Sequence, residues 1–303
     1  MYSKLGISPI GWSNDDFEDL GGDVSYEQCL EDISKAGYKG CEIGTNFPSD
    51  IKTLEAQLIK RDIQVCNKWF GFHLTTTPFE TVKNEFEAHL RYLRELNIQV
   101  VSGAELGYST YKRPIPALND KKECSIECWQ LFTRGLNALG KLAGEYGIRL
   151  AYHPHVGTIV QSTKETQRLL DSTDPSNVFI TYDSGHAAFA GEDPLAFLQL
   201  FMDRIAHVHL KDLRPKVLDK VIEEKMSFQQ AVSAGVFTVP GDPQGSVDFK
   251  TILRELDDFG YDGWLVVEAE QDPAKAPPFE YAKLAIEYLK FILSTPKGRS
   301  SSQ

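Results

Sequence analysis

The chain has 303 residues, 42% of them hydrophobic, and a formal net charge of −11. This length suits one globular domain of the size of an α/β barrel, about 250 residues, and the acidic balance argues against binding to a phosphate backbone. No apolar run reaches the roughly 18 residues of a membrane helix, and the N-terminus reads directly into a strand pattern without a leader, so we expect a cytoplasmic protein. The five cysteines, among which only Cys124 and Cys128 are close in sequence, predict no disulfide framework and no zinc site.

Apolar runs of strand type alternate with helical patterns from one end of the chain to the other. The helical pattern is clear at residues 81–96, where apolar side chains recur every three or four positions. Ser25 and Gly37 are typical of the start and the end of another helix. The expected strands are 5–11, 39–43, 63–69, 99–105, 149–152, 178–182, 204–212 and 264–267, and the expected helices are 25–36, 50–61, 81–96, 125–146, a segment from 164, 194–202, 248–259 and 278–293.

This alternation predicts an α/β fold, a single-domain (β/α)8 TIM barrel over residues 1–293. A doubly wound open sheet is less favoured, because no glycine-rich phosphate fingerprint follows the first strand. The segment 107–120, rich in Pro and Tyr, is expected to be an active-site loop or an oligomer contact. An inserted helix is expected at 216–234, after the seventh strand, and the polar tail 294–303 is expected to be disordered.

Residues of metal-ligand type close four consecutive strands. His153 follows the fifth strand, Asp183 the sixth, His209 lies near the end of the seventh, and Glu268 ends the eighth. Each alone could be a turn residue, a solvated strand end or a packed histidine, but all four at one rim of a barrel predict a shared site. Two imidazoles and two carboxylates suit Mn²⁺, Co²⁺, Fe²⁺ or Zn²⁺ better than Mg²⁺, which prefers oxygen alone.

Several runs in the C-terminal half resemble the xylose isomerase-like superfamily of sugar isomerases, sugar epimerases and apurinic endonucleases. They are Tyr-Asp-Ser-Gly-His at 182–186, Ala-His-Val-His-Leu-Lys-Asp at 206–212, the turn at 239–249, and Glu268. Longer runs, at 6–16, 68–70, 152–158 and 266–273, are more narrowly similar to the myo-inosose-2 dehydratase family of inositol catabolism. The resemblance implies a TIM barrel and a lyase that removes water from 2-keto-myo-inositol, giving a trihydroxycyclohexane-1,2-dione.

The resemblance also implies a divalent metal, Mn²⁺ or Co²⁺, and an association with glutathione, for which the sequence shows no site. One position departs from the superfamily, because His153 stands where the sugar epimerases have a second metal-bound glutamate opposite the position of Glu268. An elimination needs one base and one acid, whereas an epimerase exchanges a proton between two such carboxylates. The histidine therefore favours a lyase over the alternative, a metal-dependent sugar or inosose isomerase or epimerase.

Two further classes of function are disfavoured by the sequence. A phosphodiester-cleaving repair enzyme of the same superfamily would need a basic surface facing DNA, and the net charge is −11. A non-catalytic binding protein would leave four metal-type residues at one rim without a purpose. We expect a small cyclic polyol ketone as the partner, neither nucleic acid nor a membrane, and a homo-oligomer.

The mechanistic hypothesis assigns one pair of candidates to each proton transfer. The ketone and an adjacent hydroxyl would chelate the metal, which acts as a Lewis acid and stabilises the enolate. Glu268 or Lys68 would take the α-proton, and His155 or His186 would protonate the leaving hydroxyl. Lys68 can equally be a solvated strand-end lysine, unless burial lowers its pKa enough for it to act as a base.

Other polar and aromatic residues at strand ends are candidates for holding the ring. Carboxylates, amides and guanidinium groups could bind ring hydroxyls, and an indole could form a wall, although an aromatic residue there is equally often core. His207 would orient a ligand or simply pack. The candidates for substrate binding are Glu42, Asn67, Trp69, Glu105, Arg214 and Glu270.

Overall fold

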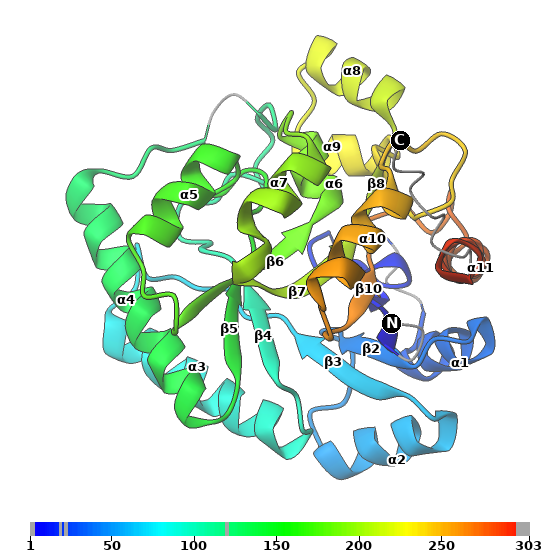
Figure 1. Ribbon diagram of the computed structural model, residues 1–303, viewed down its shortest axis with the longest axis horizontal. Helices are drawn as coiled ribbons and strands as arrows, with labels where there is room; N and C mark the ends of the chain where they lie inside the picture. Colours follow the sequence, from blue (N-terminus) through cyan, green and yellow to red (C-terminus); the bar gives the residue numbers. More distant parts are fainter. Residues whose placement is uncertain (1–3, 18–19, 21–23, 119–120, 295–303) are drawn as a thin grey trace, which may run out of the picture.

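The computed structural model describes residues 4–17, 20, 24–118 and 121–294, and its centre is one eight-stranded parallel sheet. Its strands follow the order β3-β2-β1-β10-β7-β6-β5-β4, so β1 pairs with β10 and the sheet curls toward closure (Figure 1). The eight strands are β1 (Leu5–Ile7), β2 (Gly40–Ile43), β3 (Gln64–Lys68), β4 (Val100–Gly103), β5 (Arg149–Tyr152), β6 (Val178–Asp183), β7 (Ile205–Leu210) and β10 (Leu265–Val267).

The seam between β3 and β4 is closed by the segment that follows β3. Phe70 N–H donates to the carbonyl of Ser102 (3.0 Å), and Phe72 N–H donates to the carbonyl of Ala104 (2.8 Å). Phe72 also forms a parallel bridge with Glu105. The chain therefore forms the predicted barrel, whose last pairing lies just beyond the strand ends.

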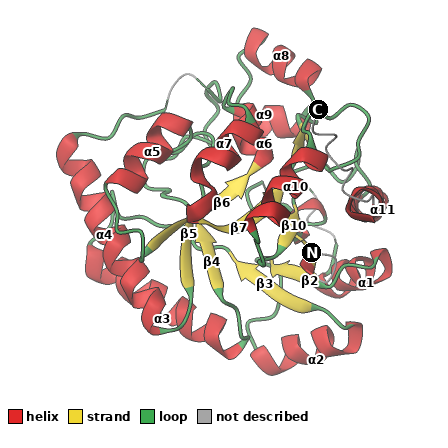
Figure 2. Ribbon diagram, in the orientation of Figure 1, coloured by secondary structure: helices red, strands yellow, loops and turns green. Residues whose placement is uncertain are grey.

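Helices surround the strands, as the red ribbons around the yellow sheet in Figure 2 show. Their ends follow local capping rules: Ser25 accepts a hydrogen bond from Gln28 N–H at the start of α1, and Gly37 ends that helix with a φ of 98°. The helices of the described residues are α1 (Tyr26–Ala36), α2 (Ile51–Arg61), α3 (Phe79–Glu95), α4 (Ile126–Glu145), α5 (Thr163–Asp171), α6 (Ser184–Phe189), α7 (Pro194–Phe201), α8 (Pro215–Glu223), α9 (Phe228–Ser233), α10 (Phe249–Phe259) and α11 (Pro278–Ser294).

Alternate residues of each strand face opposite sides of the sheet. On β7, Val208 and Leu210 belong to the large apolar core that the helices share with the sheet, whereas His207 and His209 point to the barrel interior and lie beside Glu42 of β2. All four side chains are buried. The fold thus places polar side chains inside the barrel and apolar ones under the helices.

Two local predictions differ from the structure. The first strand ends at Ile7 rather than residue 11, because Pro9 begins a short 3-10 helix, Pro9–Gly11. The inserted segment 216–234 is two helices rather than one, since α8 ends at Glu223 and Ser227 begins α9 with a capping box to Gln230. The two-stranded hairpin of β8 (Asp212–Leu213) and β9 (Phe237–Thr238) joins this insertion to the barrel.

The sequence predicted no disulfide framework, and the structure contains one local disulfide that was not expected. Cys124 and Cys128 form a disulfide at the start of α4, where four-residue spacing across the helix cap brings their Cα atoms to 5.6 Å. The other three cysteines are free and buried. The predicted tail lies outside the described residues except for Ser294, which is the last residue of α11. None of the described helices is both long enough and apolar enough to cross a bilayer.

Candidate active site

A cavity of about 350 Å³ opens where the strands end, at the rim that carries the predicted site residues. The carboxyl ends of the strands form the active-site face of a parallel barrel. The residues used below that border this cavity are Asp15, Asp16, Glu42, Lys68, Trp69, His73, Tyr111, Lys112, His153, His155, His186, His209, Glu268 and Glu270.

Asp183 lies at the centre of the four predicted metal ligands. Its Oδ2 atom is 3.3 Å from Nε2 of His153 and 3.4 Å from Nδ1 of His209. Its Oδ1 atom accepts a hydrogen bond from the backbone N–H of His186, because Asp183 is also the N-cap of α6. Burial would raise the pKa of Asp183, but Lys211 and the neighbouring histidines hold it well below the usual value.

Glu268 completes this group from the end of β10. Its Oε2 atom lies 3.4 Å from Nδ1 of His209, the same nitrogen that faces Asp183. Burial, with Glu270 as a further cause, raises the pKa of Glu268 despite the nearby ammonium of Lys211. Among the described side chains, Nδ1 of His209 is a buried polar atom without a hydrogen bond, and it faces the carboxylates of Asp183 and Glu268. Nε2 of His153 also faces Asp183, and this mixed set of nitrogen and oxygen donors fits a divalent transition metal.

Lys211 provides a permanent positive charge beneath this group. Its ammonium lies 2.6 Å from Oε2 of Glu268, 2.7 Å from Oε2 of Glu270 and 3.2 Å from Oδ2 of Asp183. The side chain is fully buried, and its stem passes so close to Gly185 that a Cβ there would lie 2.3 Å from Cγ of the lysine. Three carboxylates and one ammonium leave a net charge of about −2, which a divalent cation would neutralise.

Two neighbouring imidazoles differ in which nitrogen carries the proton. Nδ1 of His155 donates to the carbonyl of Val156 (2.7 Å), so the neutral ring has a bare Nε2. Nδ1 of His186 instead accepts the N–H of Val156 (3.4 Å), so its Nε2 carries the proton, 3.4 Å from Oε1 of Glu270. Burial and nearby positive groups lower the pKa of both histidines well below the usual value. His155 is therefore an acceptor and His186 a donor.

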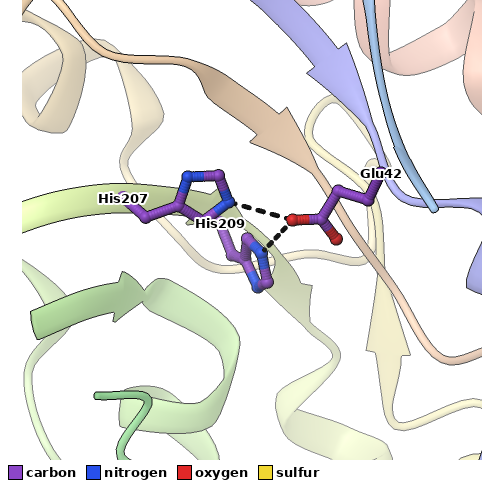
Figure 3. Close-up of side chains that lie close together, drawn as sticks. All are labelled: Glu42, His207 and His209. Carbon is purple, nitrogen blue, oxygen red and sulfur yellow. Dashed lines mark hydrogen bonds and ion pairs between the residues drawn. The ribbon is translucent and has the colours of Figure 1, made fainter. Parts of the chain in front are cut away.

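Glu42 borders the cavity from β2 and is bound by three neighbouring side chains. Its Oε1 atom accepts hydrogen bonds from Nε2 of His207 (2.9 Å), from Nε2 of His209 (3.1 Å) and from Nδ2 of Asn67 (2.8 Å). Figure 3 shows both imidazoles directed at this single oxygen. Burial would raise the pKa of Glu42, but the two histidines hold it well below the usual value. His207 is thus bonded within the site rather than merely packed.

The edge of the cavity is formed by the segment after β3 and by the segment expected to be an active-site loop. Trp69 is 38% exposed, with its ring 5.5 Å from that of His153. Burial lowers the pKa of the adjacent Lys68, although Asp15 acts in the opposite direction. Tyr111 and Lys112, from the segment 107–120, border the cavity and both contact Asp16.

Three candidates for substrate binding do not border the cavity. Glu105 accepts hydrogen bonds from the backbone of Leu74 (2.8 Å) and Gly107 (2.9 Å), and Arg214 is paired with Asp242. Asn67 is 1% exposed and bonded to Glu42. All three are polar residues at or after strand ends, but their side chains bind loops or neighbours instead of facing the cavity.

Sequence reasoning missed several residues that the structure brings to the site. Asp15, Asp16 and His73 border the cavity, although none of them was among the predicted site residues. The central place of Lys211 was also missed. Its alternation with His207 and His209 on one strand was the available signal.

The chain is similar to known proteins over almost its whole length. The family model described as "Xylose isomerase-like TIM barrel" matches residues 30–292. A Geobacillus thermodenitrificans protein named inosose dehydratase is 49% identical over 95% of this chain and 96% of its own length. Proteins with the same name from Clostridium beijerinckii and Lacticaseibacillus casei are 46% and 42% identical, over 95% and 98% of this chain and 96% and 100% of their own lengths.

Solved structures show the same fold at low sequence identity. A Bacillus anthracis protein described as a probable 3-DHS dehydratase superposes with a TM-score of 0.72 at 17% identity, covering 95% of this chain and 98% of that one. A structure of L-ribulose 3-epimerase has a TM-score of 0.68 at 16% identity, covering 96% and 94%. The barrel is thus common to a protein described as a dehydratase and one described as an epimerase, so the fold alone does not tell which activity a chain has.

Proposed function

Because the chain belongs to the inosose dehydratases of the xylose isomerase-like TIM-barrel family, we propose that it is a hydro-lyase that removes water from 2-keto-myo-inositol and gives a trihydroxycyclohexane-1,2-dione. The observation that carries the proposal is the position of His209. Its Nδ1 atom faces Oδ2 of Asp183 and Oε2 of Glu268, each at 3.4 Å, without a hydrogen bond of its own. Elimination next to a ketone calls for buried, preorganised charge beside the substrate, and the two carboxylates that face His209 supply a place for a cation there.

We assign His153, Asp183, His209 and Glu268 as the ligands of a divalent metal, Mn²⁺ or Co²⁺. Two nitrogen and two oxygen donors support this choice, and the net charge of about −2 around Lys211 supports a dication. When bound, the metal supplies a Lewis acid that stabilises negative charge on the oxygen of the ketone. The protein residues supply the two proton transfers.

Glu268 or Lys68 takes the proton from the carbon beside the ketone. Burial raises the pKa of Glu268 and lowers the pKa of Lys68. Each pKa therefore shifts toward neutral pH, where a general base is most effective. Of the two candidates for the acid, His186 fits better, because its Nε2 carries a proton beside Glu270 while Nε2 of His155 is bare. We therefore propose that His186 protonates the leaving hydroxyl and that His155 accepts a hydrogen bond from a ring hydroxyl.

The substrate lies, in this proposal, between Trp69 and the carboxylates of Glu42 and Glu270, all of which border the cavity. A cavity of about 350 Å³ is large enough for a six-membered ring with its hydroxyls. We further propose that the protein is a cytoplasmic homo-oligomer and that it binds no nucleic acid. The acidic net charge supports only the last of these statements.

The test is turnover by metal-stripped protein with and without added Mn²⁺ or Co²⁺. The ultraviolet absorbance of the conjugated dione would follow water loss, and deuterium uptake from solvent would follow enolisation. Metal-dependent absorbance supports the dehydratase. Deuterium uptake without absorbance would replace it with an isomerase, the second activity that this cavity chemistry allows.

A further inference from the structure

The carboxylate of Glu42 is bound at one oxygen by three donors from two other strands. Oε1 accepts Nε2–H of His207 (2.9 Å) and Nε2–H of His209 (3.1 Å), both from β7, and Nδ2–H of Asn67 (2.8 Å) from β3 (Figure 3). A carboxylate oxygen with three donors around it carries no proton of its own. Glu42 is therefore an acceptor at this oxygen, and both imidazoles present N–H groups to it.

This bond decides which nitrogen of His209 is available on the other side of the ring. A histidine binds a metal as the neutral imidazole, which has one N–H. In that form Glu42 holds the hydrogen on Nε2, so the lone pair is on Nδ1. Nδ1 is the buried atom without a hydrogen bond that lies 3.4 Å from both Asp183 and Glu268. The ring thus links Glu42 on one side to the two carboxylates on the other.

We propose that Glu42 is a positioning residue: it fixes the tautomer and the orientation of His209 so that Nδ1 binds the divalent metal. This inference rests on the proposed function, which supplies the metal. The Oε1 atom of Glu42 is then occupied by protein donors, so only Oε2 remains for the expected role in substrate binding. Carboxylates that accept the second N–H of a metal-bound histidine commonly raise metal affinity by about 10- to 100-fold.

The surroundings of Glu42 make it rigid enough for this role. Asn67 cannot turn its amide over without losing a bond, because its Oδ1 atom accepts the backbone N–H of Ser102 (2.9 Å) while its Nδ2 group donates to Glu42. Asn67 is 1% exposed and His207 is also 1% exposed. The carboxylate is therefore held by β2, β3 and β7 at once, before any ligand binds.

A second metal site between Glu42, His207 and His209 is the competing explanation of the same cluster. It fits less well, because Oε1 of Glu42 already accepts the amide of Asn67, and a metal would have to displace two imidazole protons from the same oxygen. Under our proposal the protein binds one metal per chain at this group of residues.

The experiment is a Co²⁺ titration of the metal-stripped full chain, followed by calorimetry and by the visible absorption of bound Co²⁺. Glu42→Gln keeps an oxygen acceptor but loses the charge, and Glu42→Leu loses both. We expect the Kd for Co²⁺ to rise about 10- to 100-fold in Glu42→Gln and further in Glu42→Leu, with a changed absorption spectrum, while stoichiometry stays at one. His207→Gln keeps the bond between Glu42 and His209 and should raise the Kd by less than about threefold.

Asp212→Asn is the matched control. Asp212 is a buried carboxylate three positions after His209, but its Oδ1 atom accepts the backbone N–H groups of Leu213, Ser246 and Val247, and it does not border the cavity. The Kd of the Asp212→Asn variant for Co²⁺ should stay within about threefold of the parent value. A parent chain that binds no Co²⁺ would overturn the proposed function. If the parent binds Co²⁺ but Glu42→Gln has the same Kd, only the positioning role of Glu42 is overturned. The same holds if the parent binds two ions per chain.

Discussion

The ammonium of Lys211 lies 2.6 Å from Oε2 of Glu268, and the lysine side chain is fully buried. Two further carboxylates, Asp183 and Glu270, lie within 3.2 Å of the same nitrogen. The lysine is held charged, because these carboxylates raise its pKa despite burial. The protein therefore carries its own cation among these three carboxylates.

Replacing this cation is expected to destabilise the metal-free protein strongly. Lys211→Met would leave three buried carboxylates without their partner, and breaking a buried pair in this way costs about 3–5 kcal/mol. Urea unfolding of the metal-stripped protein measures the effect. The control is Lys83→Met, because Lys83 makes an exposed ion pair with Glu80 that is worth about 0–1 kcal/mol. Equal unfolding free energies for the two variants would contradict the structural role of Lys211.

Deuterium exchange separates the two candidate bases. If Glu268 takes the α-proton, Glu268→Gln lowers the exchange rate of the substrate by about 10²–10⁴, whereas Lys68→Met leaves it within about tenfold of the parent. The measurement is proton loss from 2-keto-myo-inositol in D₂O, at saturating metal so that weakened binding by Glu268→Gln does not dominate. The reverse pattern would assign the proton transfer to Lys68.

The donor character of His186 predicts a split between the two half-reactions. His186→Gln should slow water loss by about 10²–10⁴ while deuterium uptake at the α-carbon continues, because only the acid for the leaving hydroxyl is removed. His155→Gln is the comparison, since Nε2 of His155 has no proton to give and its loss should act mainly on KM. Absorbance and deuterium uptake, measured on the same samples, decide between them. A larger loss of water elimination in His155→Gln would exchange the two roles.

His89 makes stability sensitive to acid, away from the cavity. Burial lowers its pKa to about 4, although a hydrogen bond with the carbonyl of Lys68 (3.1 Å) acts in the opposite direction. In the unfolded chain the pKa is about 6.5, so between these values the unfolded state binds more protons and stability falls as the pH falls. From pH 7 to 4.5 this histidine should cost about 2 kcal/mol.

The measurement is urea unfolding at both pH values for the parent and for His89→Gln. Glutamine does not titrate, so the variant should lose about 2 kcal/mol less than the parent over this interval. Subtracting the two removes the contributions of all other groups. An identical loss in both proteins would mean that His89 is protonated in the folded state as readily as in the unfolded one.

Much of the site could be predicted from the sequence because parallel strands end at one rim. His153, Asp183, His209 and Glu268 follow different strands, and the structure brings Asp183 within 3.4 Å of both histidines. Because β5, β6, β7 and β10 are successive neighbours in the barrel, residues at the ends of these strands lie close together. The same reasoning could find the helix capped by Ser25, since a cap depends on only a few adjacent residues.

The direction of a side chain beyond the last paired residue could not be predicted in this way. Glu105 follows β4 as Glu268 follows β10, yet Glu105 turns to the backbone of Leu74 and Gly107. Strand alternation gives the face of a residue, but a loop contributes its own N–H groups and can redirect a carboxylate. The role of Lys211 was equally hidden, because it depends on three acidic residues from two other strands.

Asp183 divides its two oxygens between two tasks, with Oδ2 facing the imidazoles and Oδ1 capping the helix that carries His186 in its first turn. These two parts of the site are therefore mechanically coupled and cannot be adjusted separately. A shift of the carboxylate toward an incoming cation pulls on the start of α6 and with it on the imidazole of His186. A redesign that relocates the acid must also provide a new cap, and a substitution at position 183 will always report on both functions at once.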